Sequence, residues 1–267
     1  MKLAEVQADR RILILGASGS GKTHLVGTLC RIMPTLVITA DKNGLETLKG
    51  MGVNPEVVLV EDWRKIIDYE GEIARATARC QAVAIDDIGA LQAMALEKII
   101  YMPRTKGEED AARGTPDKFQ RIVKKELLLG ERQLRFQSRD WPSLFTSLDT
   151  FLLDILRMPY AVKLVTALET VRDNPRDGAD KIYPSLDGAI RTVLPAHFSL
   201  VAEAFIATLD GKMHYALTCQ SHPRIETKSR YGQGRTWVDP DMLEVLGYIN
   251  GQGEPESELE KRIGTGL

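Results

Sequence analysis

An eight-residue stretch near the amino terminus constrains this chain more than any other feature. Residues 16–23 read Gly-Ala-Ser-Gly-Ser-Gly-Lys-Thr and fit the pattern G-x-x-x-x-G-K-[ST] at every fixed position. The apolar run 11–15 precedes the stretch and predicts a buried strand, and residues 24–33 follow it and predict a helix that Pro34 stops. Strand, glycine-rich loop and helix in this order surround a phosphate with backbone N–H groups at the positive end of the helix.

Two side chains of this stretch are predicted to contact a nucleotide complex directly. Lys22 would reach the β- and γ-phosphates, and the Thr23 hydroxyl would ligate Mg²⁺, so the predicted cofactors are ATP and Mg²⁺. A chance glycine-rich turn is the alternative, but such a turn would not need the strand and helix that flank this one. The other predicted phosphate contacts are Gly16, Ala17, Ser18, Gly19, Ser20, Gly21 and His24.

Apolar strands alternate with helices after the loop. Strands are predicted at 35–40, 56–60, 81–85 and 161–167. This alternation predicts an α/β fold in which helices flank a mostly parallel central sheet. Ligands of such sheets bind at the carboxyl ends of the strands, so Lys22, Asp41 and Asp86 are predicted to converge there.

The strand at 81–85 ends in two aspartates, which is the Walker B pattern. Asp86 would hold Mg²⁺, through water, together with Thr23. Asp87 has two interpretations, since it would either polarise the attacking water or cap the next helix. A strand that ends in an aspartate turn by chance is the alternative for Asp86, and the nearby phosphate loop weighs against it.

Composition excludes several other classes of protein. A chain of 267 residues with 43% apolar residues can bury a substantial core, and its net charge of −2 predicts no attraction of the whole protein to nucleic acid. Three distant cysteines predict no disulfide framework, and four histidines show no zinc-ligand spacing. Neither a signal peptide nor a membrane span is apparent, so a soluble cytoplasmic protein is expected.

A basic segment interrupts the α/β rhythm at about 101–140. Residues 104–139 hold ten basic and six acidic side chains, with Phe119 and Phe136 among them. The segment would contact a nucleic-acid backbone and stack a base, or it would be a solvated helix face. The basic side chains that crowd its later part are Lys118, Arg121, Lys124, Lys125, Arg132, Arg135 and Arg139.

The last third of the chain has its own pattern. An amphipathic helix is predicted at 143–158, a polar loop at 169–184, and a β-hairpin at 198–220 with a tight turn at Asp210-Gly211. A basic glycine-bearing loop at 228–234 and a helix at 239–249, with Pro240 in its first position, follow. We therefore expect one ATPase domain over residues 1–250 and a flexible tail over residues 251–267.

The sequence resembles two families of ATPase. GxxGxGKTHL at residues 16–25 and IDDI at residues 85–88 resemble AAA+ replication initiators and helicase loaders. That family implies a carboxy-terminal helical lid, whereas this chain continues with a strand and a hairpin. The whole-chain pattern is similar to RecA-like ATPases, particularly the compact bacteriophage proteins described as nucleotide-binding or single-strand annealing (Sak-type) proteins.

The RecA-like resemblance implies further roles. Lys228-x-Arg230-x-Gly232 resembles the K-x-R-x-G loop of hexameric replicative helicases, in which the lysine and arginine enter the neighbouring subunit's nucleotide site. The resemblance implies a homo-oligomer, a ring or a filament, that has nucleotide between subunits and binds single-stranded DNA. Recombination, annealing or replication in a phage setting, with a single-strand-binding protein or a helicase as partner, is the implied context. A basic hairpin tip on the surface is the alternative for Lys228 and Arg230.

One position departs from the RecA-like pattern. The family usually has a catalytic glutamate at the end of the strand after the phosphate-loop helix, and the matching residue here is Asp41. Asp41 is implied to orient the attacking water, with Glu61 on the next strand as the second candidate. A small-molecule P-loop kinase, with 104–139 as its lid, and an ATP-binding interaction protein without turnover remain open alternatives.

Overall fold

A ten-stranded sheet runs through the centre of the molecule. The computed structural model describes residues 9–100, 113–114, 121, 140–173, 180–222, 224–225 and 227–265. The strands are β1 (Arg10–Gly16), β2 (Thr35–Thr39), β3 (Glu56–Leu59), β4 (Ala82–Ile85), β5 (Val162–Asp173), β6 (Asp180–Pro184), β7 (Leu200–Leu209), β8 (Lys212–Thr218), β9 (Lys228–Ser229) and β10 (Thr236–Val238).

The order of the strands places β1 near the middle of the sheet. The order is β10-β8-β7-β1-β5-β4-β2-β3, and β6 pairs with β5 while β9 pairs with β7. The six strands from β7 to β3 are parallel, whereas β8 and β10 are antiparallel additions beside β7. Gly16 at the end of β1 lies opposite Leu168 of β5 and Ala204 of β7, so the phosphate loop starts between two parallel neighbours.

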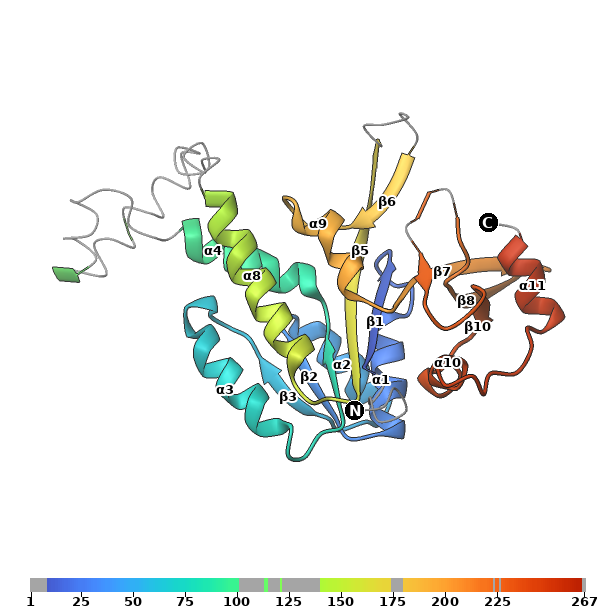
Figure 1. The fold of residues 1–267 in the computed structure, drawn as a ribbon, viewed down its shortest axis with the longest axis horizontal. Helices are drawn as coiled ribbons and strands as arrows, with labels where there is room; N and C mark the ends of the chain where they lie inside the picture. The colour runs from blue at the N-terminus through green and yellow to red at the C-terminus, as the bar shows by residue number, and fades with distance from the viewer. Residues whose placement is uncertain are drawn as a thin grey trace, which may run out of the picture.

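Helices cover both faces of the sheet (Figure 1). They are α1 (Lys22–Ile32), α2 (Lys42–Gly50), α3 (Ile66–Ala76), α4 (Ile88–Ile100), α8 (Asp140–Arg157), α9 (Ile190–Val193), α10 (Met242–Ile249) and α11 (Glu258–Thr265), with 3-10 turns at Trp63–Lys65 and Leu194–His197. The fold is α/β with a mostly parallel central sheet flanked by helices, and the predicted α/β fold class is confirmed.

The core consists of two apolar layers, because successive side chains of a strand point to opposite faces. Leu13 and Leu15 of β1 pack in one layer, with side chains from α3, α4 and α8. Ile12 and Ile14 pack in the other layer, with side chains from α1 and α10. Burial on both faces explains why β1 reads as a continuous apolar run rather than an alternating one.

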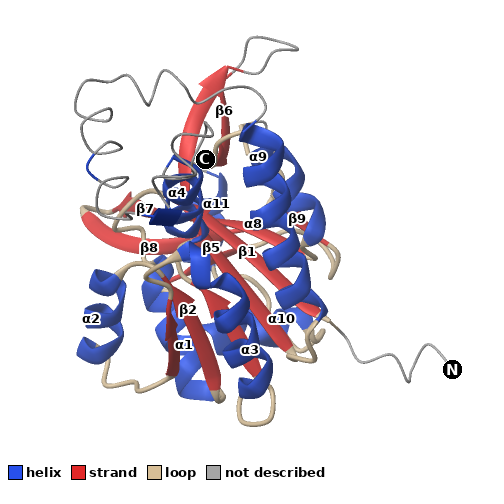
Figure 2. Ribbon diagram, turned by 90° about the vertical axis from the view of Figure 1, so that its left-hand side faces the viewer, coloured by secondary structure: helices blue, strands red, loops and turns tan. Residues whose placement is uncertain are grey.

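The hairpin of β7 and β8 forms as the sequence predicts. Asp210 and Gly211 have φ angles of 52° and 76°, the left-handed conformations that a two-residue turn between twisted strands requires. From this turn, β7 and β8 pair in an antiparallel register that runs from Leu209 opposite Lys212 to Glu203 opposite Thr218. The antiparallel part of the sheet is therefore a direct continuation of the parallel strand β7 (Figure 2).

Some predicted elements differ from the structure. The polar loop expected at 169–184 is largely a β-ribbon, since β5 extends to Asp173 and β6 returns from Asp180, and the ribbon rises beyond the rest of the sheet in Figure 1. The helix expected to start at Asp239 begins at Met242, because the Asp241 side chain accepts a hydrogen bond from Glu244 N and caps it.

The expectation of a flexible tail from residue 251 does not match the structure. Helix α11 forms there, and its Ile263 is buried. Nearly all of the basic segment at 101–140 lies outside the described residues, and so do its proposed contacts. None of the described helices is long and apolar enough to span a membrane.

Candidate functional site

A cavity of about 600 Å³ lies at the carboxyl ends of the parallel strands. Most of the predicted site residues, but not Gly16, Ala17, Lys228 or Arg230, and several unpredicted ones form its wall: Ser18, Gly19, Ser20, Gly21, Lys22, Thr23, His24, Leu25, Asp41, Thr47, Asp86, Asp87, Leu168, Tyr215, Ala216, Asp239 and Pro240. The convergence predicted for Lys22, Asp41 and Asp86 is present in this wall.

The loop before α1 presents backbone donors to the cavity. Gly19 and Gly21 have φ angles of 79° and 91°, a conformation that L side chains rarely adopt. Gly21 is the residue that precedes α1, and no side chain caps the first turn of this helix. The amino-terminal N–H groups of α1 therefore remain available to an anion, which also fits the positive end of the helix dipole.

Lys22 is folded onto the loop itself. Its ammonium donates to the carbonyl oxygens of Gly16 and Ala17, both at 2.7 Å. Burial lowers the pKa of Lys22, although the carboxylates of Asp87 and Asp86 oppose this effect. A cation is thus held within the loop that would receive phosphate.

Asp86 is buried where two hydroxyl groups meet it. Thr23 Oγ1 donates to Asp86 Oδ2 at 2.8 Å, and Thr166 Oγ1 of β5 donates to Asp86 Oδ1. Burial raises the pKa of Asp86, and these two donors counteract the rise. The Thr23 hydroxyl and the Asp86 carboxylate supply adjacent oxygen atoms, the donor type that Mg²⁺ prefers, so the residues fit the predicted metal.

Asp41 lies beside this pair. Its carboxylate caps α2 by accepting a hydrogen bond from Asn43 N at 2.8 Å. A Cβ atom placed on Gly44 would lie 3.5 Å from Asp86 Oδ2 and 3.7 Å from Asp41 Oδ2, which shows that both carboxylates border the same space. Glu61 does not line the cavity, and its 60% exposed side chain forms an ion pair with Lys42 at 2.7 Å.

Asp87 caps a helix, one of its two predicted roles, and it also borders the cavity. Gly89 N donates to Asp87 Oδ1 at the start of α4, so the side chain caps this helix. Asp87 also lines the cavity, and burial raises its pKa. A second carboxylate therefore lies within the wall next to Asp86.

Lys228 and Arg230 lie away from the cavity of their own chain. Strand β9 pairs with the first residues of β7, where Val201 lies opposite Lys228. The register between β1 and β7 places Leu200 opposite Ile12, four residues before the loop, or about 13 Å along the strand. Arg230 is exposed at this far end, whereas His24 is exposed at the cavity itself.

Tyr215 and Asp239 were missed at the sequence level. A Cβ atom on Gly21 would lie 3.3 Å from Tyr215 Cδ1, so the ring of this half-exposed tyrosine lies against the phosphate loop. Asp239 Oδ1 accepts from Tyr215 N at 3.1 Å, and Asp239 N donates to Tyr215 O at 2.7 Å. The predicted hairpin was the only sequence signal for Tyr215, since nothing local shows that β8 faces the loop.

Known proteins with similarity to this chain are found among solved structures and protein families. No curated protein matches the chain. Among solved structures, a KaiC-like protein from the hyperthermophilic archaeon Pyrococcus horikoshii OT3 is 12% identical, with a TM-score of 0.44 over 87% of this chain and 90% of that one. The flagellar accessory protein FlaH from Methanocaldococcus jannaschii is also 12% identical, with a TM-score of 0.41 over 87% of this chain and 86% of that one.

The comparison with protein families matches most of the chain. The matched residues, 8–231, contain the phosphate loop, the strand that ends in Asp86, and the hairpin that carries Tyr215. This chain belongs to the family described as an AAA domain, and it is a P-loop ATPase domain.

Proposed function

We propose that the protein binds and hydrolyses MgATP in this cavity, oligomerises with nucleotide between subunits, and binds single-stranded DNA in phage-type recombination, annealing or replication. One observation supports the nucleotide part most strongly. Lys22 and Thr23 at the uncapped start of α1 meet Asp86, which directly follows β4, in one cavity.

Each residue of the cavity has a role in this proposal. The loop N–H groups and Lys22 bind phosphate oxygens, and Thr23 and Asp86 hold Mg²⁺, which neutralises charge on the β- and γ-phosphates when bound. Asp41 orients the water that attacks the γ-phosphorus in line, and Asp87 is the second candidate because it lines the same cavity.

The nucleobase would lie against Tyr215. The ring is 52% exposed and borders the loop from β8, on the side of the cavity that Asp239 and Pro240 continue. An exposed aromatic ring is an effective platform for a base, because every base has a π-face. This contact separates the base end of the cavity from its phosphate end at Lys22.

The oligomeric part of the proposal rests on Lys228 and Arg230. Their K-x-R-x-G resemblance implies that they act on a neighbouring subunit's nucleotide, and their position outside their own cavity is compatible with that role. An arginine supplied in trans stabilises the charge of the transferring phosphoryl group. The DNA part rests on the resemblance and on the basic segment 104–139.

A helicase-loader role is the second candidate, since the family is described as an AAA domain. The described carboxy-terminal part adds β8 and β10 to the sheet, with α10 against α1 and α11 against β10, whereas this candidate implies a helical lid. A loader would bind a helicase tightly and DNA weakly. A small-molecule kinase would transfer the γ-phosphate to an acceptor other than water.

The test compares ATP hydrolysis with and without single-stranded DNA. We expect stimulation by DNA, loss of hydrolysis in Arg230→Ala and in Lys22→Ala, and partial recovery when the two variants are mixed, since each supplies what the other lacks. Arg157→Ala, which changes an exposed arginine on α8, is the matched control. If Arg230→Ala hydrolyses ATP at the wild-type rate, the proposed role of Arg230 in trans is wrong. If single-stranded DNA neither binds to the protein nor changes its rate of ATP hydrolysis, the proposed DNA binding is wrong.

A further inference from the structure

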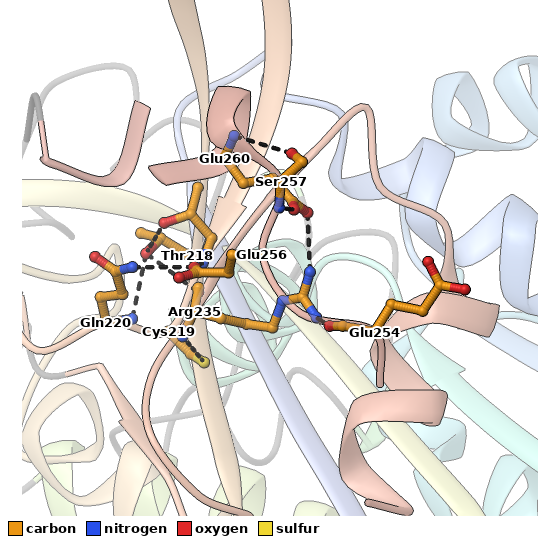
Figure 3. Close-up of polar contacts among 9 residues, drawn as sticks. Thr218, Cys219, Gln220, Arg235, Glu254, Glu256, Ser257 and Glu260 are labelled. Atoms are coloured by element: carbon orange, nitrogen blue, oxygen red, sulfur yellow. Dashed lines mark hydrogen bonds and ion pairs between the residues drawn. The ribbon is translucent and has the colours of Figure 1, made fainter. Parts of the chain in front are cut away.

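The carboxy-terminal residues 254–265 cover the outer edge of the sheet at β10. Thr236 N of this edge strand donates to Glu256 Oε1 at 2.7 Å. The same oxygen accepts from Gln220 Nε2 at 3.2 Å (Figure 3). An edge strand normally leaves such donors to water or to another strand. Here, a side chain of the tail takes that place.

A buried ion pair anchors the same segment. Arg235 Nη2 lies 3.0 Å from Glu260 Oε1, and each side chain is only 12% exposed. Arg235 Nη1 also donates to the carbonyl of Glu254 at 2.6 Å, and the guanidinium lies 5.1 Å from the centre of the Trp237 ring. Arg235 therefore joins the tail to the edge strand at two points of the tail (Figure 3).

Glu260 has a different task for each of its oxygens. Oε2 accepts from Ser257 N at 2.6 Å, and Ser257 Oγ accepts from Glu260 N at 3.2 Å, which is the capping box that starts α11. Oε1 is the partner of Arg235. A glutamine at this position can keep the capping box while it removes the charge opposite Arg235.

Helix α11 lies behind the strand that carries Tyr215. Side chains alternate along β8, so Tyr215 shares a face with Leu217, whose layer also contains α1 and α10. Thr218 and its partner Thr236 point to the other face, where a Cβ atom on Gly264 of α11 would lie 2.8 Å from Thr236 Oγ1. The front of these strands thus faces the phosphate loop, and their back faces α11.

The helix also reaches the tip of the hairpin. Both terminal nitrogens of Arg262 donate to the Asp210 carboxylate, each at 3.1 Å. This pair is exposed, so it contributes little by itself. Through Arg235 and Thr236 the tail contacts β10 at the edge of the sheet, and through Arg262 it contacts the turn between β7 and β8.

We propose that residues 254–265 form a brace that holds β8 and β10 against the phosphate loop, with Glu256 and Glu260 as positioning residues for nucleotide binding. The proposal rests on the proposed function, because it assumes that the base of ATP lies against Tyr215. The brace acts on the base end of the cavity only, since Lys22 and the loop are attached to β1 and α1.

The test measures the Kd of ATP and of inorganic tripolyphosphate by calorimetric titration. Glu260→Gln should weaken ATP about fivefold and leave tripolyphosphate unchanged, because only ATP has a base for Tyr215. Glu258→Gln, which removes an exposed pair with Lys261 on the same helix, is the control and should behave as the wild type. Glu256→Ala and Glu256→Gln form a second pair of variants, which tests the brace independently of Glu260. The glutamine variant keeps an oxygen acceptor for Thr236 N, and the alanine variant removes it.

A double-mutant cycle with Tyr215→Ala distinguishes positioning from general destabilisation. If the brace acts through Tyr215, Glu260→Gln has no further effect on ATP binding once the ring is absent. Three results would overturn the brace. Glu260→Gln could weaken ATP binding equally in the wild-type and in the Tyr215→Ala background, or it could weaken tripolyphosphate binding as much as ATP binding. It could also bind ATP with the same affinity as Glu258→Gln. A wild-type protein that binds no ATP would instead overturn the proposed function itself.

Discussion

Buried charges define the phosphate end of the cavity at the scale of single residues. Burial lowers the pKa of Lys22 and raises the pKa of Asp86 and of Asp87, so desolvation acts against each of these three charges. The cation and the two carboxylates offset one another, and Thr23 and Thr166 donate hydrogen bonds to Asp86. A phosphate with its metal would enter a site whose charges are only partly compensated.

Glu203 gives a pH-dependent prediction. It is buried on β7, and burial, with the nearby Glu169 carboxylate, raises its pKa from 4.5 to about 7. A raised pKa means that the fold favours the protonated form, so this stabilisation is complete below about pH 4.5 and is lost as the pH rises through about 7. Glu203→Gln should therefore be more stable than the wild type at about pH 8.5, by roughly 1 kcal/mol.

Urea unfolding of both proteins at about pH 4.5 and pH 8.5 checks this prediction. The advantage of Glu203→Gln should shrink or disappear at the lower pH, where the wild-type carboxyl group is protonated in the folded state and about half protonated in the unfolded state. A difference that stays the same at the two pH values would show that the Glu203 carboxyl group is not the titrating group.

Tyr215 gives a prediction for ligand discrimination. Tyr215→Ala should weaken ATP by about 1–3 kcal/mol, the usual contribution of a base stacked on an aromatic ring, and Tyr215→Phe should stay near the wild type. Fluorescence titration with a labelled adenine nucleotide, competed by ATP, measures both. If Tyr215→Ala binds ATP as tightly as Tyr215→Phe and the wild type do, the base lies elsewhere in the cavity.

At the scale of elements, local signals predicted most of the fold. The loop at 16–23, the strand that ends in Asp86 and the turn at Asp210-Gly211 each depend on a few neighbouring residues, and the structure contains all three elements. Helix α11 also had a local signal, the capping box from Ser257 to Glu260, but the glycine- and glutamate-rich composition of the tail suggested flexibility. Contacts with Arg235, distant in sequence, fix this helix.

The turn itself gives a prediction at this scale. Gly211 has a positive φ and no atom within 4 Å of a Cβ placed on it, so Gly211→Ala would add backbone strain without a clash. We expect it to destabilise the protein by about 1–2 kcal/mol, measured by urea unfolding. Gly114→Ala, at an open position for which no positive φ is found, is the control, and equal stability of the two variants would contradict the turn geometry.

The site was only partly predictable, for a physical reason. Lys22, Thr23, Asp41 and Asp86 were predicted together because the carboxyl ends of parallel strands meet at one edge of the sheet. Tyr215 and Thr166 depend instead on the strand order, which brings β8 and β5 beside the loop and the Asp86 strand. The hydrophobic pattern of single strands contains no information about that order.

At the scale of the whole molecule, the cavity lies where two parts of one sheet meet. The parallel strands supply the loop and the acidic residues, and the antiparallel strands supply the wall with Tyr215 and Asp239. The tail braces the second part from behind through Arg235 and Thr236. Phosphate binding and base binding are thus assigned to different elements, and they can be tested separately.

The steady-state rate of ATP hydrolysis in the presence of Mg²⁺ decides whether this cavity turns over ATP. It is measured for the wild type, Lys22→Ala and the control Arg157→Ala. We expect magnesium-dependent hydrolysis by the wild type and by Arg157→Ala, and a rate at least about 100-fold lower for Lys22→Ala, because the phosphates lose their charged partner. Hydrolysis by Lys22→Ala at the wild-type rate would contradict the assignment of this cavity as the site of ATP turnover.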